Sequence, residues 1–432
     1  MNLEADVAGL LKHAQEGAPV DSLLASAEKL RLDERPGASF DASAVREQSW
    51  RTRLQVRARL DAFGDGEIVL VRRLFSTLRA LEDALGERER GLPDLDADQE
   101  KFEREAARPI LDSAPFYDCR LAPGFSVGTM PFRSGDVMLA RGPTFLSASV
   151  ARLGTPPGHY SHLVLLHVGP GGQVCTLESY HHLGLKTYEL DVALRNCNLR
   201  LMLLRPRDAA LGAASAEALF EVVRRAKRPI PYDFAQNFDE HSAVSCAEVA
   251  SWAYELGSGG AVRLPMHPSR VTLEPGFRRQ LGLEAERTFE PQDLEVDPRF
   301  ELLLEWRDLR FTRDARHRDA IASALFDWST RLGYRFRGSA RTWAAMNVIW
   351  PLRHTPLWPL LLKLGAPPLS PSMPRSLLGT MQQIDEAGHL LLSRLREADR
   401  AHVEKTGRPM SPLELQQALE ALRPSVHAIF RP

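Results

Sequence analysis

Cys246 stands at a chemically useful point in the stretch SAVSCAEVASWAYELG at 242–257. Ser245 and Glu248 have the spacing of a capping box, which predicts a helix with Cys246 at its first position. Unpaired amides and the positive end of the helix dipole favour a thiolate there, so the sulfur becomes a better nucleophile. The predicted buried face of this helix consists of Val249, Trp252, Ala253 and Leu256. A buried core cysteine is the alternative interpretation, and a catalytic role requires a base and an orienting group.

A predicted β-hairpin supplies both groups. Its two apolar strands and its turn are SHLVLLHV, QVCTLES and GPGG, all within 161–179. His162 begins the first strand and Glu178 ends the second. If Val168 lies opposite Val174, the two side chains share one face, whereas a register shifted by one residue separates them. We predict the same-face register, in which Glu178 holds one ring nitrogen of His162 and the other nitrogen accepts the thiol proton.

Other polar residues carry weaker signals. Tyr232 and Asp233 precede the cysteine helix and are candidate substrate-binding residues, although a packed tyrosine and a turn aspartate explain them equally well. Ordinary structural roles are expected for Cys175, Cys197, His159, His167, His181 and His182. A zinc set drawn from Cys175, His181, His182 and Cys246 matches no ligand spacing, and GPGG is a hairpin turn rather than a phosphate-binding loop. The sequence therefore predicts neither a metal nor a cofactor.

The order of the central segments is similar to that of a known group of enzymes. These segments are GDVMLARG, SHLVLLHV, LESYHHLG, PYDF and SCAEVASWAYE. The order resembles the circularly permuted papain-like enzymes of the NlpC/P60 superfamily, of the YaeF/YiiX type, in which the histidine precedes the cysteine. The resemblance covers 133–256 and implies that His162 is the base, Glu178 the orienting acid and Cys246 the nucleophile. The family often has serine after its cysteine. Ala247 stands there in this chain, so a hydroxyl contact with substrate is lost.

The resemblance implies a thiol hydrolase that cleaves an amide bond, in a peptide or an acyl-amide, through a Cys-His-Glu triad and a covalent acyl-enzyme. Two alternatives stay open. One is a lipid-directed thiol esterase or acyltransferase, which would take a lipid-like substrate. The other is a non-catalytic binding or scaffold protein with a vestigial triad.

Composition narrows the class of protein. The chain has 432 residues, 44% of them apolar, and a net charge of −1, so no nucleic-acid partner is expected. Its four cysteines form no CxxC pair, which is typical of a reducing compartment. The first residues lack the features of a signal peptide. We expect a cytoplasmic protein.

The fold class is predicted to be α+β. A permuted papain-like domain at 111–290, with a small antiparallel sheet and packed helices, is expected between helical regions at 1–110 and 291–432. The stretch 342–365 is rich in tryptophan, but prolines and cations interrupt it too often for a transmembrane helix. It is expected to pack between domains. Peripheral contact with a membrane surface, through Trp343, Trp350 and Trp358, is the alternative.

Overall fold

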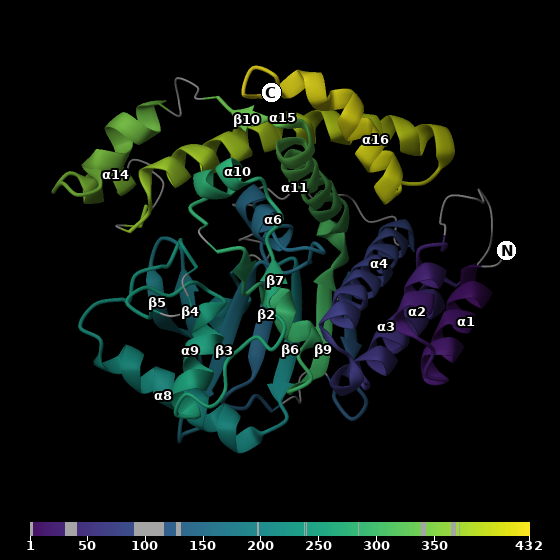
Figure 1. The fold of residues 1–432 in the computed structure, drawn as a ribbon, viewed down its shortest axis with the longest axis horizontal. Helices are drawn as coiled ribbons and strands as arrows, with labels where there is room; N and C mark the ends of the chain where they lie inside the picture. The colour runs from purple at the N-terminus through teal and green to yellow at the C-terminus, as the bar shows by residue number, and fades with distance from the viewer. Residues whose placement is uncertain are drawn as a thin grey trace.

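A central antiparallel sheet organises the α+β fold (Figure 1). The computed structural model describes residues 3–30, 41–89, 116–126, 131–196, 198–236, 238, 240–283, 285–337, 343–363, 369–370 and 372–432. Within them the sheet has seven strands in the order β1-β9-β6-β2-β3-β4-β5. Their bounds are β1 Tyr117–Leu121, β2 Val137–Arg141, β3 His162–Val168, β4 Val174–Tyr180, β5 Gly184–Glu189, β6 Arg200–Pro206 and β9 Phe300–Asp308.

The predicted hairpin is present as β3 and β4. Every residue of β2 and β6 is buried, because both strands lie inside the sheet and are covered on both faces. The sheet is larger than predicted, since β1 and β9 extend it beyond β6.

Strand β9 contradicts the expectation that the chain returns to helix after Pro291. Its sequence, FELLLEWRD, carries charged residues at buried positions: Glu305 and Arg307 are both almost fully buried. Because charges are rarely buried unless paired, this stretch does not resemble a core strand in sequence. Its partners come from helices more than 200 residues earlier in the chain.

Those helices form the N-terminal part of the molecule: α1 Leu3–Gln15, α2 Val20–Ala27, α3 Ala42–Arg57 and α4 Asp65–Glu89. Buried ion pairs attach α3 and α4 to β9. Arg53 Nη1 lies 2.6 Å from Glu305 Oε2, and Arg79 Nε lies 2.8 Å from Glu305 Oε1. Although burial disfavours the carboxylate, Arg53, Arg79 and Arg307 hold the pKa of Glu305 well below its usual value of 4.5. The N-terminal helices are therefore fixed to the sheet through paired charges.

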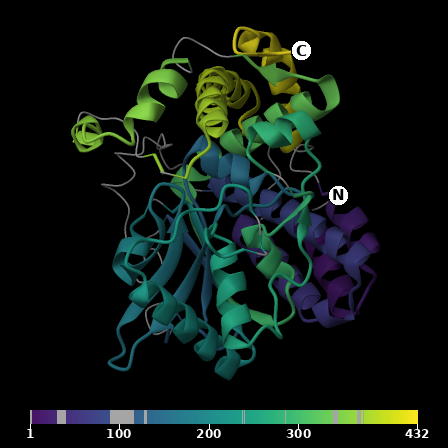
Figure 2. The ribbon, with the colours of Figure 1, turned by 60° about the vertical axis from the view of Figure 1, so that its left-hand side comes forward.

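The remaining helices form two groups (Figures 1 and 2). Helices α8 Ala209–Arg225 and α9 Glu248–Gly257 pack on one face of the sheet. Helices α6 Phe145–Ala151, α11 Thr312–Leu332, α15 Arg375–Thr406 and α16 Pro412–Leu422 form a second core above one end of the sheet. A capping box starts α16, since the Ser411 and Glu414 side chains each accept from the other residue's amide.

The shorter elements are α7 Leu190–Leu194, α10 Pro275–Gln280, α13 Trp350–Leu352, α14 Trp358–Lys363, β7 Ser269–Arg270, β8 Arg287–Thr288, β10 Arg335–Phe336 and β11 Phe430–Arg431. Short 3-10 or π turns are η1 Leu60–Ala62, η2 Pro291–Val296, η3 Leu309–Phe311, η4 Ala345–Ile349 and η5 Arg423–Val426. Among the helices that the structure describes, none is both long enough and apolar enough to cross a membrane.

Candidate active site

The β3–β4 hairpin adopts the predicted register. Val168 lies opposite Val174, so His162 and Glu178 share one face of the sheet. His162 Nε2 lies 2.9 Å from Glu178 Oε2, within hydrogen-bond distance. The sequence pattern therefore located this contact correctly, because turn length and strand alternation decide it together.

Glu178 is held rigidly. It is 1% exposed, and its carboxylate also accepts from the hydroxyl groups of Thr176 and Tyr180, the latter at 2.6 Å. The Tyr180 ring also stacks on His162, with ring centroids 4.8 Å apart. Tyr180 was missed at the sequence level, although the same register places it directly opposite His162. These contacts fix both the position and the orientation of the imidazole.

Cys246 lies in the turn just before α9, not in the first helical position as predicted, since the helix begins at Glu248. The capping box is confirmed: the Ser245 amide donates to the Glu248 carboxylate, and the Glu248 amide lies 3.4 Å from Ser245 Oγ. Along the helix, Val249 and Ala253 are buried as predicted and Trp252 is half-buried. Leu256 is 38% exposed, so its predicted burial is wrong, because the last turn of α9 extends beyond the core.

Cys246 lies close enough to the imidazole of His162 to affect its pKa. The thiol also lies 3.9 Å from the Ser161 carbonyl oxygen. Burial disfavours the imidazolium, but the hydrogen bond to Glu178 and the interactions with the neighbouring Cys246 raise the pKa of His162 to about 10. At neutral pH the His162 ring is therefore protonated beside the Glu178 carboxylate.

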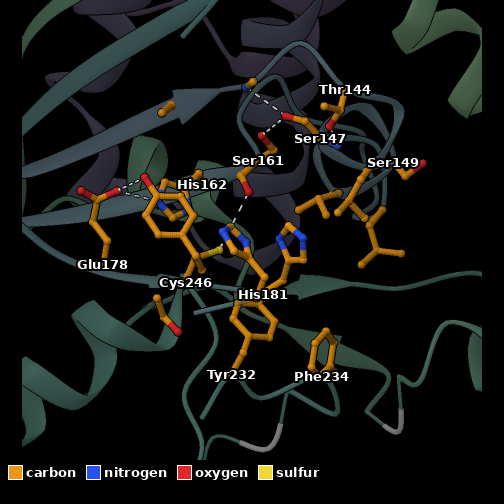
Figure 3. A pocket seen from close by; sticks show the side chains of 18 of the residues that line it. Thr144, Ser147, Ser149, Ser161, His162, Glu178, His181, Tyr232, Phe234 and Cys246 are labelled. Atoms are coloured by element: carbon orange, nitrogen blue, oxygen red, sulfur yellow. Dashed lines mark hydrogen bonds and ion pairs between the residues drawn. The ribbon is translucent and has the colours of Figure 1, made fainter. Parts of the chain in front are cut away.

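Tyr232 lies on the other side of the nucleophile (Figure 3). Burial, together with the nearby Cys246 and Glu248, raises the pKa of its hydroxyl well above 10. The phenol therefore remains a neutral donor.

Asp233 lines the same cavity but has structural contacts. Its Oδ1 accepts from the Ala235 amide at 2.8 Å, which is a turn-forming bond. It also faces Glu248: burial and the Asp233 carboxylate raise the pKa of Glu248 to about 7. The predicted alternative for Asp233, a turn aspartate, thus describes its local geometry.

The triad opens into a cavity of about 340 Å³. Thr144, Ser147 and Ser161 form a polar wall, which Figure 3 shows beside His162. The rest of the cavity includes a group of apolar side chains, called here the apolar wall: Leu146, Val150, Leu153, Leu281, Leu283, Phe326, Leu377, Met381 and Ile384. This wall is built by α6, by the C-terminal helices α11 and α15, and by the stretch after α10, so residues outside the resemblance contribute to the site.

His181 also lines this cavity. Burial and the nearby charges of His182 and His162 lower its pKa to about 4. It therefore stays neutral at physiological pH beside a protonated His162. The feature of the sequence that could have indicated this is that His181 directly follows β4, the strand that contains Glu178.

Another cysteine, Cys175 on β4 of the hairpin, also lies near a histidine that is paired with a glutamate. Cys175 Sγ lies 3.7 Å from His167 Nδ1, and His167 Nε2 lies 2.8 Å from Glu217 Oε2. Burial raises the pKa of the Cys175 thiol, so it remains protonated. Cys175 does not line the cavity of Cys246. Cys197, the other cysteine with a predicted structural role, lies outside the described residues. The described residues hold no group of three or more His, Cys, Asp or Glu side chains that could bind a metal ion.

Comparisons with known proteins give no family for this chain. No family model, curated protein or solved structure matches it significantly. The function is therefore argued from the site itself.

Proposed function

We propose that the chain is a thiol hydrolase with a permuted papain-like catalytic centre, acting on an amide bond of a peptide or acyl-amide. The observation that carries this proposal is the imidazole of His162, which hydrogen-bonds to Glu178 through Nε2 and whose pKa is raised by the neighbouring Cys246. A cysteine, a base and an orienting acid in contact, at the edge of a cavity, are the parts that covalent acyl transfer needs.

The reaction proceeds in two steps. The Cys246 thiolate attacks the carbonyl carbon, and the developing oxyanion accepts hydrogen bonds from the Cys246 amide and the Tyr232 hydroxyl. Imidazolium His162 donates its proton to the leaving nitrogen as the C–N bond breaks, which leaves a thioester on Cys246. Neutral His162 then takes a proton from water, and the hydroxide attacks the thioester carbon. The C–S bond breaks, the acid departs and the ion pair of His162 and Cys246 is restored.

The apolar wall of the cavity favours a second candidate, a lipid-directed thiol esterase or acyltransferase. Nine aliphatic, aromatic or thioether side chains line this wall. Each methylene of an acyl chain that is buried against apolar surface contributes about 0.8 kcal/mol of binding free energy. The two candidates share the thioester intermediate. A series of p-nitrophenyl esters of increasing chain length separates them: kcat/KM rises by about fourfold per methylene if the wall binds the chain, and stays level if it does not.

Trapping the acyl-enzyme tests the common step. The protein is mixed with a p-nitrophenyl acyl ester and with acyl-amide libraries, quenched in acid and digested, and the peptide mass reveals the acylated residue. We expect acylation of Cys246, and none in Cys246→Ala. Cys175→Ala is the matched control, because Cys175 also contacts a histidine that is paired with a glutamate. Acylation that persists in Cys246→Ala and disappears in Cys175→Ala contradicts the proposal.

The binding or scaffold alternative has its own test. Cys246 in a vestigial triad would react with iodoacetamide no faster than Cys175, at neutral pH in the folded protein. An activated Cys246 reacts at least about tenfold faster, because its thiolate is paired with an imidazolium while the Cys175 thiol stays protonated.

A further inference from the structure

The tryptophan-rich segment, residues 343–363, is unusual for its exposure. It contains η4, α13 and α14, and Figures 1 and 2 show it at the outer edge of the C-terminal helices. None of its described side chains is buried, although most are apolar. Packing between domains, the role expected from the sequence, therefore accounts for only part of this surface.

One side of the segment is attached to the protein. Trp350 and Trp358 contact a small core of Leu369, Met373 and Leu378. Trp350 Nε1 donates to the Met373 carbonyl at 3.2 Å, and the Arg353 guanidinium covers the Trp350 ring at 3.7 Å. The segment is thus held in place by its inner tryptophans.

The other side presents large apolar side chains to solvent. Trp343 is 63% exposed, Leu357 56% and Leu360 55%, and Val348 and Leu362 are also exposed. Exposed apolar residues gathered on one short stretch of a folded protein indicate an interaction surface. Because the inner side is already anchored, these residues remain available to a partner.

The charge of this region restricts the partner. Between 328 and 384 the sequence contains no Asp or Glu, and its cations are Arg331, Arg335, Arg337, Arg341, Arg353, Lys363 and Arg375. The whole chain, by contrast, has a net charge of −1. Arg331 and Arg335 pair with acids from other segments, but Arg353 and Lys363 lie within the tryptophan-rich segment itself. A local excess of positive charge attracts an anionic surface.

The same region adjoins the cavity of Cys246. Phe234 and Met381 line that cavity, and both also pack in the core that anchors Trp350 and Trp358. A surface bound by the segment would therefore lie near the apolar wall of the cavity.

We propose that the tryptophan-rich segment docks the protein on an anionic phospholipid membrane. Trp343, Leu357 and Leu360 enter the boundary between headgroups and acyl chains, while the exposed Lys363 lies among the phosphates. Tryptophan suits this boundary because its ring is apolar and its N–H is polar. A second copy of the chain is a poorer partner, since a two-fold contact through this face would bring its cations together. The proposal is independent of catalysis by Cys246.

Vesicle co-sedimentation of the full chain tests the proposal. We expect binding to vesicles of phosphatidylcholine mixed with phosphatidylglycerol, weaker binding to pure phosphatidylcholine, and a decrease with salt. Leu357→Glu/Leu360→Glu lowers the partition coefficient by at least about tenfold, because two apolar side chains no longer enter the interface. Leu413→Glu on α16 and Val69→Glu on α4 are matched controls, because each also replaces an exposed apolar side chain, but outside the tryptophan-rich segment. Both control variants should bind vesicles as the wild type does.

Two further measurements complete the test: tryptophan fluorescence on vesicles, and the molecular mass of the protein in solution, which distinguishes a monomer from a dimer. Trp343 emission should shift to shorter wavelength on anionic vesicles, and Trp343→Ala should abolish that component and weaken binding. The altered side chains are exposed, so circular dichroism should stay unchanged. The proposal is overturned if the wild type ignores anionic vesicles, or if the control variants lose binding as much as the double variant does. It is equally overturned if the wild type is a dimer without vesicle affinity and the double variant is a monomer.

Discussion

Glu178→Gln isolates the charge that Glu178 places beside His162. Glutamine has almost the same shape and still offers an oxygen to the Tyr180 hydroxyl, but it carries no negative charge. The hydrogen bond between His162 and Glu178, 2.9 Å long, is one of the causes that hold the pKa of His162 at about 10. The change therefore alters the protonation of the base while it leaves the cavity intact.

The size of the effect follows from that bond. A hydrogen bond to a charged group contributes about 1.5–3 kcal/mol, and about 1.4 kcal/mol displaces a pKa by one pH unit. The pKa of His162 should thus fall from about 10 to between about 8 and 9. The raised pKa keeps His162 protonated up to about pH 10 in the wild type. In Glu178→Gln, His162 should therefore lose its proton at a lower pH.

The assay compares two reagents at Cys246. Iodoacetate is anionic and iodoacetamide is neutral, so the ratio of their alkylation rates is high while His162 is protonated and falls when it loses its proton. Peptide-mapped mass spectrometry measures the ratio against pH in both proteins, with Cys119 as an internal reference, since burial raises its thiol pKa to about 11. If the pH at the midpoint of the fall in this ratio is the same in Glu178→Gln as in the wild type, the reasoning that the Glu178 carboxylate stabilises the imidazolium is refuted.

Three further changes test neighbouring features. Tyr180→Phe keeps a ring against His162 but removes the 2.6 Å donor to Glu178, so kcat on an acyl ester should fall by about tenfold; an unchanged kcat would show that the hydroxyl has no positioning role. Because the folded pKa of Glu248, about 7, exceeds its ordinary 4.5, the stability it contributes is complete below 4.5 and is lost as pH rises through 7. Asp233→Asn should reduce that loss, as thermal unfolding on either side of neutral pH will reveal; an equal loss in both proteins contradicts the coupling. Glu305→Gln leaves buried arginines without compensation and should lower the free energy of unfolding in urea by about 3–5 kcal/mol, whereas a change below about 1 kcal/mol would show that the network contributes little.

The local parts of the site were predictable from the sequence. The contact between His162 and Glu178 depends on the alternation of two adjacent strands and on one short turn, and both are encoded within 161–179. The capping box at Ser245 and Glu248 likewise depends on residues three apart. Such features are set by neighbouring residues, so a pattern of residue types is enough to locate them.

Contacts between distant segments were not predictable in the same way. Strand β9 was missed because Glu305 and Arg307 make it look polar, and their partners on α3 and α4 are known only after folding. The apolar wall of the cavity was missed for a related reason. Phe326, Met381 and Ile384 have the spacing of ordinary core helices, and only the packing of α11 and α15 against α6 turns them toward Cys246.

The sequence by itself determined the hairpin, its register and the capped turn that carries Cys246, because each depends on short-range periodicity and hydrogen bonding. The tertiary structure decided how those parts meet. It brought Cys246 to His162 across 84 residues of chain (246 − 162 = 84), surrounded them with a half-apolar cavity and left Trp343, Leu357 and Leu360 exposed. The physical reason is that burial, and with it the charge of His162, depends on segments that approach one another only when the whole chain packs.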